Sequence, residues 1–106
     1  MDHLLSAIEA REIAPGFMAK FVHSEFMTTS FVEVEEGAEL PLHSHMNEQI
    51  SIITKGEFEM TIDGVTNIYE PGMVIEIPAN VPHEGRALTA CKITDVFCPV
   101  REDFKS

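Results

Sequence analysis

Basic residues are scarce in this chain of 106 residues, which has seven Lys and Arg against eighteen Asp and Glu and a net charge of −11. Nucleic acids and anionic membrane surfaces attract proteins through clustered Lys and Arg side chains, so we expect neither as a partner. A small anionic substrate is compatible with this charge. Charges more than about 8 Å apart are heavily screened at physiological salt, so a metal ion or an arginine dominates its own pocket.

Long apolar segments are also absent. No run approaches the roughly 20 apolar residues of a membrane-spanning helix. The first ten residues, MDHLLSAIEA, contain acids and no basic cluster, unlike a secretion signal. We therefore expect a cytoplasmic protein with no membrane partner.

Cysteine is limited to Cys91 and Cys98, whose spacing fits no CxxC-type metal site. On one continuous strand these two residues would point to opposite faces, which forbids a disulfide between them. We expect two reduced thiols, buried or half-buried.

The length predicts a single domain over residues 1–106. Hydrophobic residues make up 44% of the chain, enough for a core. A domain of this size buries only about two-thirds of its unfolded surface. We therefore expect a homodimer.

Residues 2–10 have weak helical spacing, and short runs rich in Phe, Val, Ile and Thr follow. Gly and Pro interrupt these runs at intervals of roughly 8 to 12 residues, as in all-β sandwiches and barrels. Apolar and polar residues alternate in FVEVEE and EFEMTID, and Asp63-Gly64 after the second run favours a tight hairpin. The pattern predicts a small antiparallel β-barrel of the jelly-roll type with a short N-terminal helical segment.

Three further segments receive specific predictions. Residues 73–77 (MVIEI) should form a strand that is buried on both faces, and residues 80–85 (NVPHEG) a loop. Residues 86–100 should form one long final strand, on which Asp95 and Phe97 share a face.

The stretch PLHSHMNEQ places His43 and His45 on one strand face, with side chains about 7 Å apart. Alone, such a pair is compatible with two solvated histidines. Gln49 follows closely, and His83 lies downstream in a loop held between Pro78 and Pro82. Three imidazoles and an amide oxygen suit a divalent transition metal (Ni, Fe, Mn or Zn) and leave two octahedral positions open.

The spacing of Gly37, His43, His45, Gln49 and Gly56 resembles the first cupin motif. Gly72, Pro78, Asn80 and His83 resemble the second, so the two motifs cover residues 37–83. Gln49 stands where many cupins have Glu, Asn80 replaces a Gly, and Ala87 replaces an Asn. The resemblance implies a cupin β-barrel, often dimeric, with a metal held by His43, His45, Gln49 and His83.

The segment DVFCPVREDF, residues 95–104, resembles the C-terminal strand and tail of the KdgF-type cupins, the pectin-degradation proteins. This resemblance implies ring opening of 4,5-unsaturated monouronates, from pectin or alginate breakdown, to linear keto-sugar acids. It places Asp95, Phe97 and Arg101 as functional residues beside the metal. The substrate would be a small anionic sugar acid.

The residues themselves leave alternatives open. Asp95 is a candidate general acid/base if buried, or one half of an ion pair with Arg101 or Arg86. Phe97 could simply be core, and Arg86 could be a second contact for an anion. Glu48 should face away from Gln49. A cupin that binds a small ligand without turnover, or an iron-dependent dioxygenase, would be compatible with the same fold.

Overall fold

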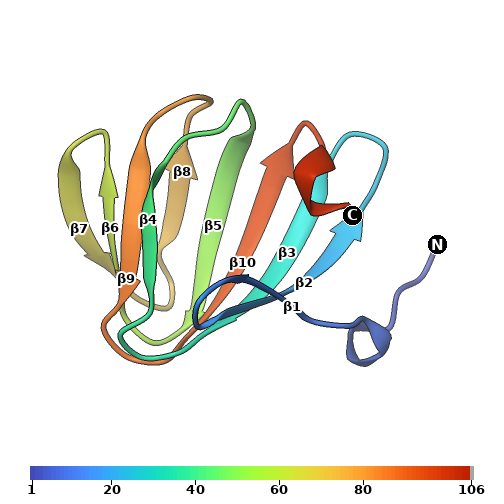
Figure 1. The fold of residues 1–106 in the computed structure, drawn as a ribbon, viewed down its shortest axis with the longest axis horizontal. Helices are drawn as coiled ribbons and strands as arrows, with labels where there is room; N and C mark the ends of the chain where they lie inside the picture. Colours follow the sequence, from blue (N-terminus) through green and yellow to red (C-terminus); the bar gives the residue numbers. More distant parts are fainter. Residues whose placement is uncertain (106) are drawn as a thin grey trace.

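The computed structural model describes residues 1–105, which form two antiparallel β-sheets that face each other (Figure 1). The larger sheet has the order β1 (Arg11–Ala14), β2 (Phe17–His23), β3 (Thr28–Val34), β10 (Cys91–Cys98), β5 (Glu48–Lys55) and β8 (Val74–Ile77). The smaller sheet has the order β4 (Glu39–His43), β9 (His83–Ala87), β6 (Phe58–Ile62) and β7 (Val65–Tyr69). One 3-10 turn, η1 (Leu5–Ala7), precedes β1, and another, η2 (Glu102–Phe104), follows β10.

The inward faces of the two sheets divide the interior into an apolar half and a polar half. Strand register aligns Ala19, Val32, Ile93 and Ile53 in one inward row. These four side chains belong to the buried hydrophobic core. The next inward row, towards the other end of the strands, reads Phe21, Ser30, Asp95 and Ser51. In these rows of the large sheet, the polar side chains therefore lie towards one end of the barrel and the apolar side chains towards the other.

Two tight turns depend on left-handed backbone conformations. Asp63 and Gly64 have φ of 49° and 79° in the β6–β7 hairpin, which confirms the predicted turn. Asn80 has φ of 65°, at the position where the cupin motif has glycine. Asparagine tolerates this conformation better than most residues, so the loop keeps its shape without glycine. The Asn80 amide donates to the carbonyl of His45 at 2.8 Å and ties this loop to the β4–β5 connection.

The all-β prediction is confirmed, with three local corrections. The expected N-terminal helical segment is present as a single 3-10 turn, and the first correction is that β1 follows it where no strand was expected. The predicted strand over residues 73–77 is not buried on both faces, because β8 is an edge strand with only one face against the core. Ile75 is 2% exposed and Val74 62% exposed.

The final segment is the third correction. The predicted single strand over residues 86–100 is two strands, because the chain turns after Ala87. The amides of Leu88 and Thr89 donate to the carbonyl of Glu57 in this turn. His83, expected in a loop, is the first residue of β9.

The two cysteines lie at the ends of β10 and point to opposite faces, as predicted. Both are free thiols, and Cys91 is buried as expected. Cys98 is exposed, which corrects the expectation of a buried or half-buried thiol there, because it lies on the outward parity at the end of the strand. No helix within residues 1–105 has the length and apolar character needed to cross a membrane.

Candidate metal centre

Three histidines converge at the polar end of the barrel. His43 ends β4 and is the register partner of His83 at the start of β9, while His45 lies two residues beyond β4. One ring nitrogen from each of the three lies within 4.8 Å of the others. The ring centroids of His43 and His83 are 4.2 Å apart, and those of His45 and His83 are 5.0 Å apart.

The hydrogen bonds of these rings define which nitrogen carries the proton. The Nδ1 atom of each histidine contacts a backbone carbonyl oxygen, which can only accept, so Nδ1–H is the donor. In the neutral ring, Nε2 then has a free lone pair directed to the centre, the usual arrangement of a metal-binding histidine. The acceptors for His43, His45 and His83 are, in turn, the carbonyls of Pro41 (2.7 Å), Asn47 (2.9 Å) and Val81 (2.8 Å).

Burial keeps two of these histidines neutral near pH 7. It lowers the pKa of His83 to about 4. The pKa of His45 is also lowered, first by burial and then by the positive charge of Arg101. Neutral imidazole is the form that binds metal.

Gln49 completes the cluster with an oxygen atom. Its Nε2 donates to Ser51 Oγ (2.9 Å) and to Asp95 Oδ1 (3.3 Å), so its Oε1 points the other way. That oxygen lies 3.0 Å from His45 Nε2. With the proton of His45 on Nδ1, both atoms present lone pairs to each other, and a cation bound by both would relieve this repulsion.

The environment of His83 also indicates a metal site. Its Nε2 is a buried polar atom without a hydrogen-bond partner among residues 1–105. Buried polar atoms are almost always paired, so an orphaned nitrogen here fits a site built for a ligand. The donors present therefore fit a divalent transition metal, with nitrogen ligands that suit Ni, Fe, Mn or Zn better than Ca or Mg.

A cavity of about 230 Å³ opens beside the histidines, between the two sheets. Side chains from both sheets and from the C-terminal tail line it. All seven site residues predicted from the sequence are among them: His43, His45, Gln49, His83, Asp95, Phe97 and Arg101.

Asp95 presents a carboxyl group to this cavity from the middle of β10. Its Oδ1 accepts from Ser51 Oγ at 2.5 Å and from Gln49 Nε2. Burial raises the pKa of Asp95 to about 6, although these two hydrogen bonds and Arg101 act to lower it. Asp95 thus contacts the amide of Gln49, whose oxygen faces His45.

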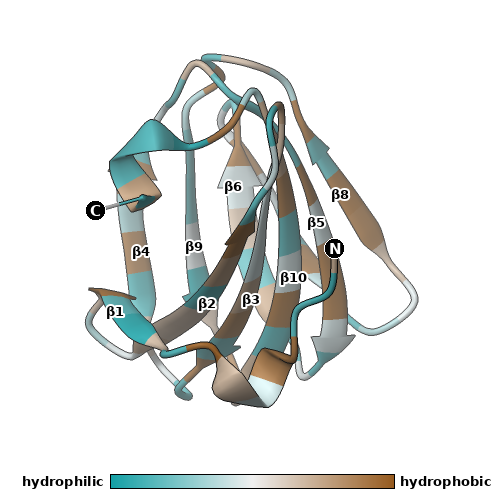
Figure 2. Ribbon diagram, turned by 90° about the vertical axis from the view of Figure 1, so that its right-hand side faces the viewer, coloured by the Kyte–Doolittle hydropathy of each residue, from teal (hydrophilic) through white to brown (hydrophobic). Residues whose placement is uncertain are grey.

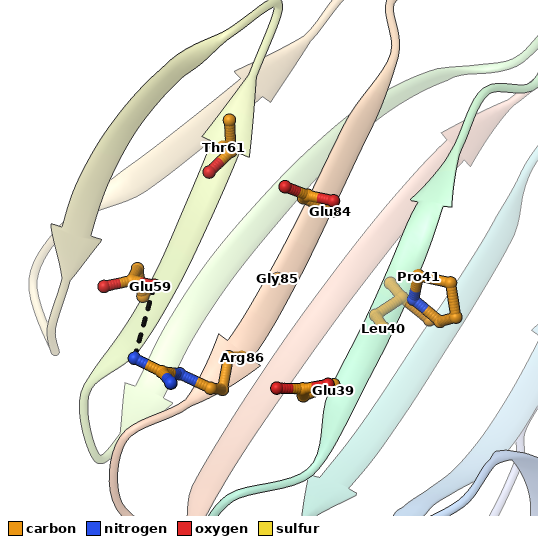
Figure 3. A pocket seen from close by; sticks show the side chains of 8 residues that line it. All are labelled: Glu39, Leu40, Pro41, Glu59, Thr61, Glu84, Gly85 and Arg86. Carbon is orange, nitrogen blue, oxygen red and sulfur yellow. Dashed lines mark ion pairs between the residues drawn. The ribbon is translucent and has the colours of Figure 1, made fainter.

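The ion pair considered for Asp95 does not form with either arginine within residues 1–105. Arg101 Nε and Nη2 donate to the two carboxylate oxygens of Asp103 at 3.0 and 2.8 Å. This hydrogen bonding lowers the pKa of Asp103. Arg86 lies on the outer face of the small sheet, where it pairs with Glu59 at 3.6 Å, so it is not a contact for an anion in the cavity (Figure 3).

The guanidinium of Arg101 is held between two aromatic rings. Its central carbon lies 4.7 Å from the centroid of Phe97 and 4.0 Å from that of Phe104. Arg101 is only 9% exposed and lines the cavity. Among residues 1–105 its Nη1 meets no hydrogen-bond acceptor, so that nitrogen is available to an anion.

Two residues of the site were not singled out from the sequence. Ser51 lies two residues after Gln49 on the same strand and therefore on the same inward face, and this spacing could have indicated it. Asn47 is 4% exposed, and its Nδ2 donates to the carbonyl of Pro99 at 2.6 Å while its own carbonyl accepts from His45. No local pattern indicates this contact, because its partners are 52 residues apart. Glu48 is exposed and faces away from the site, as predicted.

Comparison with known proteins identifies the family. Residues 30–97, more than half of the chain, match the Cupin domain family, so this chain belongs to the cupins. A Bacillus subtilis protein named H2HPP isomerase is 33% identical over 64 residues, which are 59% of this chain and 27% of that protein. The chain therefore spans about a quarter of the length of that relative.

Solved structures share the whole fold. An RmlC-like cupin from Shewanella frigidimarina has a TM-score of 0.91 at 27% identity, over 96% of this chain and 93% of that one. KdgF from a Halomonas species has a TM-score of 0.90 at 24% identity, over 97% and 96% of the two chains. Salicylate 1,2-dioxygenase from Pseudoaminobacter salicylatoxidans has a TM-score of 0.78 at 18% identity, over 82% and 26%. The last two show similarity of fold alone.

Proposed function

We propose that this cupin, with a divalent transition metal bound, promotes opening of the ring of a 4,5-unsaturated monouronate to a linear keto-sugar acid. The observation that carries the proposal is the position of Asp95, a half-buried residue whose carboxyl group is hydrogen-bonded to Gln49 and lies in the same cavity as the histidines and Arg101. The volume of about 230 Å³ is below that of most drug-sized pockets and suits one sugar ring.

The reaction is an isomerisation in which protons move and no atom is gained or lost. A proton leaves the anomeric hydroxyl as the bond between C1 and the ring oxygen breaks, which leaves an enolate oxygen on C5. A proton then adds to C4 as the enolate becomes the ketone. The catalyst must accept one proton, deliver one, and stabilise negative charge on oxygen in between.

The residues of the cavity match these needs. A metal held by His43, His45, His83 and Gln49 would supply Lewis acidity that stabilises negative charge on a substrate oxygen. Asp95 accepts and returns the proton, because burial brings its pKa to about 6, near the working pH.

The remaining two residues hold the substrate. Arg101 Nη1 binds the uronate carboxylate, with the guanidinium oriented by Asp103 and the two flanking rings. Phe97 forms an apolar wall for the sugar ring. The similarity to a protein named as an isomerase supports this class of reaction, and KdgF from Halomonas shares the fold.

The direct test follows the ultraviolet absorbance of the unsaturated ring when metal-loaded protein is added. We expect faster loss of absorbance than in buffer, and a rate for Asp95→Asn lower by about 100-fold or more. Glu59→Gln, on the outer face of the small sheet, is the matched control and should retain the wild-type rate.

The same experiment distinguishes the alternatives. No acceleration by fully loaded protein would refute the proposal, and an unchanged rate for Asp95→Asn would remove this residue from the mechanism. Saturable binding of the uronate in calorimetry without product would identify a ligand-binding cupin. Oxygen uptake with Fe(II) would identify a dioxygenase.

A further inference from the structure

Ser51 connects two residues of the candidate site from within the larger sheet. It belongs to β5, which pairs with β10, and along both strands polar residues interrupt apolar ones (Figure 2). Ser51 is the register partner of Asp95 and lies two residues after Gln49 on the same inward face. It is 0% exposed. A hydroxyl so deeply buried bears on how Asp95 and Gln49 are held, because buried polar groups are almost always hydrogen-bonded.

The hydrogen bonds of Ser51 run in one direction. The ionised carboxylate of Asp95 can only accept, so the Ser51 hydroxyl donates its single hydrogen to Asp95 Oδ1 at 2.5 Å. The Ser51 oxygen is then left to accept, and it accepts from Gln49 Nε2 at 2.9 Å. Gln49 Nε2 also donates to Asp95 Oδ1 at 3.3 Å. Both acceptors therefore require the amide nitrogen of Gln49 on their side.

The alternative orientation of the Gln49 amide is disfavoured by these partners. A turned amide would exchange its oxygen and nitrogen with little change of shape. Its carbonyl oxygen would then face the oxygens of Ser51 and Asp95, and three oxygen atoms would share the one hydroxyl hydrogen. An NH2 group, which donates and offers a metal no lone pair, would face the histidines. The observed orientation instead places Gln49 Oε1 3.0 Å from His45 Nε2.

We propose that Ser51 is a positioning residue of the metal centre, which together with Asp95 holds the amide of Gln49 with its oxygen towards the three histidines. Partners behind metal ligands commonly orient them in this way. The proposal deepens the proposed function and rests on its metal site, with Gln49 as a ligand. It does not rest on ring opening, because metal binding is measured without a substrate.

The same contacts account for an amide at position 49, where many cupins have Glu. A carboxylate there would have no hydrogen to donate to Ser51 or to Asp95. It would also bring a second negative charge against the carboxylate of Asp95, which is unfavourable at hydrogen-bond distance. Because Ser51 and Asp95 both accept from residue 49, the fourth atom that faces the metal is a neutral amide oxygen.

Ser30 offers a matched control on the other side of Asp95. Strand register sets Ser30 of β3 and Ser51 of β5 on either side of Asp95 in one inward row. Both serines line the cavity, and they are 1% and 0% exposed. Of the two, Ser51 is the one hydrogen-bonded to Gln49. Replacing either serine by alanine therefore removes one buried hydroxyl from the same wall, but only one replacement acts on the amide.

The test is a titration of metal-free protein with Co(II) against a competing chelator, which gives the dissociation constant of the metal. Ser51→Ala should raise this constant by roughly 10- to 100-fold, the usual cost of losing a partner behind a metal ligand. Ser51→Thr keeps the hydroxyl and should bind Co(II) more tightly than Ser51→Ala, while Ser30→Ala should match the wild type. An unchanged constant for Ser51→Ala, or equal losses in the two alanine variants, would overturn the proposal.

A double-mutant cycle shows whether the effect passes through Gln49. In a Gln49→Ala background there is no amide to orient, so Ser51→Ala should cost no further affinity, whereas a general structural effect would cost the same in both backgrounds and would overturn the proposal. The visible spectrum of bound Co(II) is a second readout, and in Ser51→Ala it should shift towards that of Gln49→Ala. Circular dichroism checks that each variant is folded.

The wild type separates this proposal from the proposed function. Wild-type protein that binds no Co(II) would overturn both, because both need the metal site. Binding of the metal without any acceleration of ring opening would overturn the proposed reaction and leave the role of Ser51 standing on the affinities alone.

Discussion

Replacing Asn47 by alanine tests how the C-terminal tail is held over the metal centre. The side chain of Asn47 is nearly fully buried and donates to the carbonyl of Pro99 at 2.6 Å. A second, longer contact of 3.4 Å reaches the carbonyl of Val100. The substitution removes both contacts, so it acts directly on the segment that carries Arg101.

The magnitude follows from that geometry. A typical intramolecular hydrogen bond contributes about 0.5–1.5 kcal/mol net to stability. For a domain of roughly 100 residues each kcal/mol shifts Tm by about 4–8 °C. We therefore expect the Tm of Asn47→Ala to fall by roughly 2–12 °C. If the proposed reaction operates, KM for the uronate should also rise, because Arg101 loses its fixed position.

Thermal unfolding followed by circular dichroism measures the change, with Asn67→Ala as control. Asn67 is an exposed asparagine on β7, far from the tail, and its replacement should change stability by less than about 0.5 kcal/mol. Equal Tm values for Asn47→Ala and Asn67→Ala would refute the view that this side chain anchors the tail.

Three further predictions concern other parts of the molecule. Adding Ni(II) or Zn(II) to metal-free protein at about 100 times the dissociation constant should stabilise it by about 2.7 kcal/mol, and His83→Ala should abolish the rise in Tm. Gly85→Ala should destabilise the protein by about 1–3 kcal/mol, because the added Cβ would overlap the ring of Phe58; a neutral effect would contradict this packing. The hydrogen bond from Arg101 lowers the pKa of Asp103 in the folded state. The stability that this pair provides is therefore fully present above the pKa of an unfolded Asp, near 4. It is lost as the pH falls through the lower pKa of the folded state. The Tm difference between wild type and Asp103→Asn should therefore shrink as pH is lowered below about 4, and a constant difference would show that the carboxylate charge does not contribute.

Much of this architecture could be predicted from short-range sequence patterns. Alternation defined β6, and the Asp63-Gly64 hairpin followed from the two residue types. The shared parity of Asp95 and Phe97 placed both side chains on one face of β10, and that face lines the cavity. Such features are predictable because they depend on residues within one strand or one turn.

The features that the sequence did not predict correctly depend on contacts between residues distant in sequence. Whether β8 is central or at an edge is decided by which strand comes to lie beside it, and no property of residues 73–77 encodes that. The break between β9 and β10 depends on a carbonyl at Glu57, and the role of Asn47 depends on Pro99. A single sequence does not reveal such long-range pairings.

The place of β10 in the large sheet has a consequence for biosynthesis. β3 and β5 do not pair with each other, because β10 lies between them and is hydrogen-bonded to both. Residues 28–34 and 48–55 can therefore complete their pairing only after β10, some 40 to 60 residues further along the chain, has been made. Contacts between residues so far apart in sequence slow folding. On a ribosome, the carboxyl group of Asp95 would reach Gln49 only after the whole of β10 has emerged. The contact between Asp95 and Gln49 therefore forms only once β10 has paired with β5.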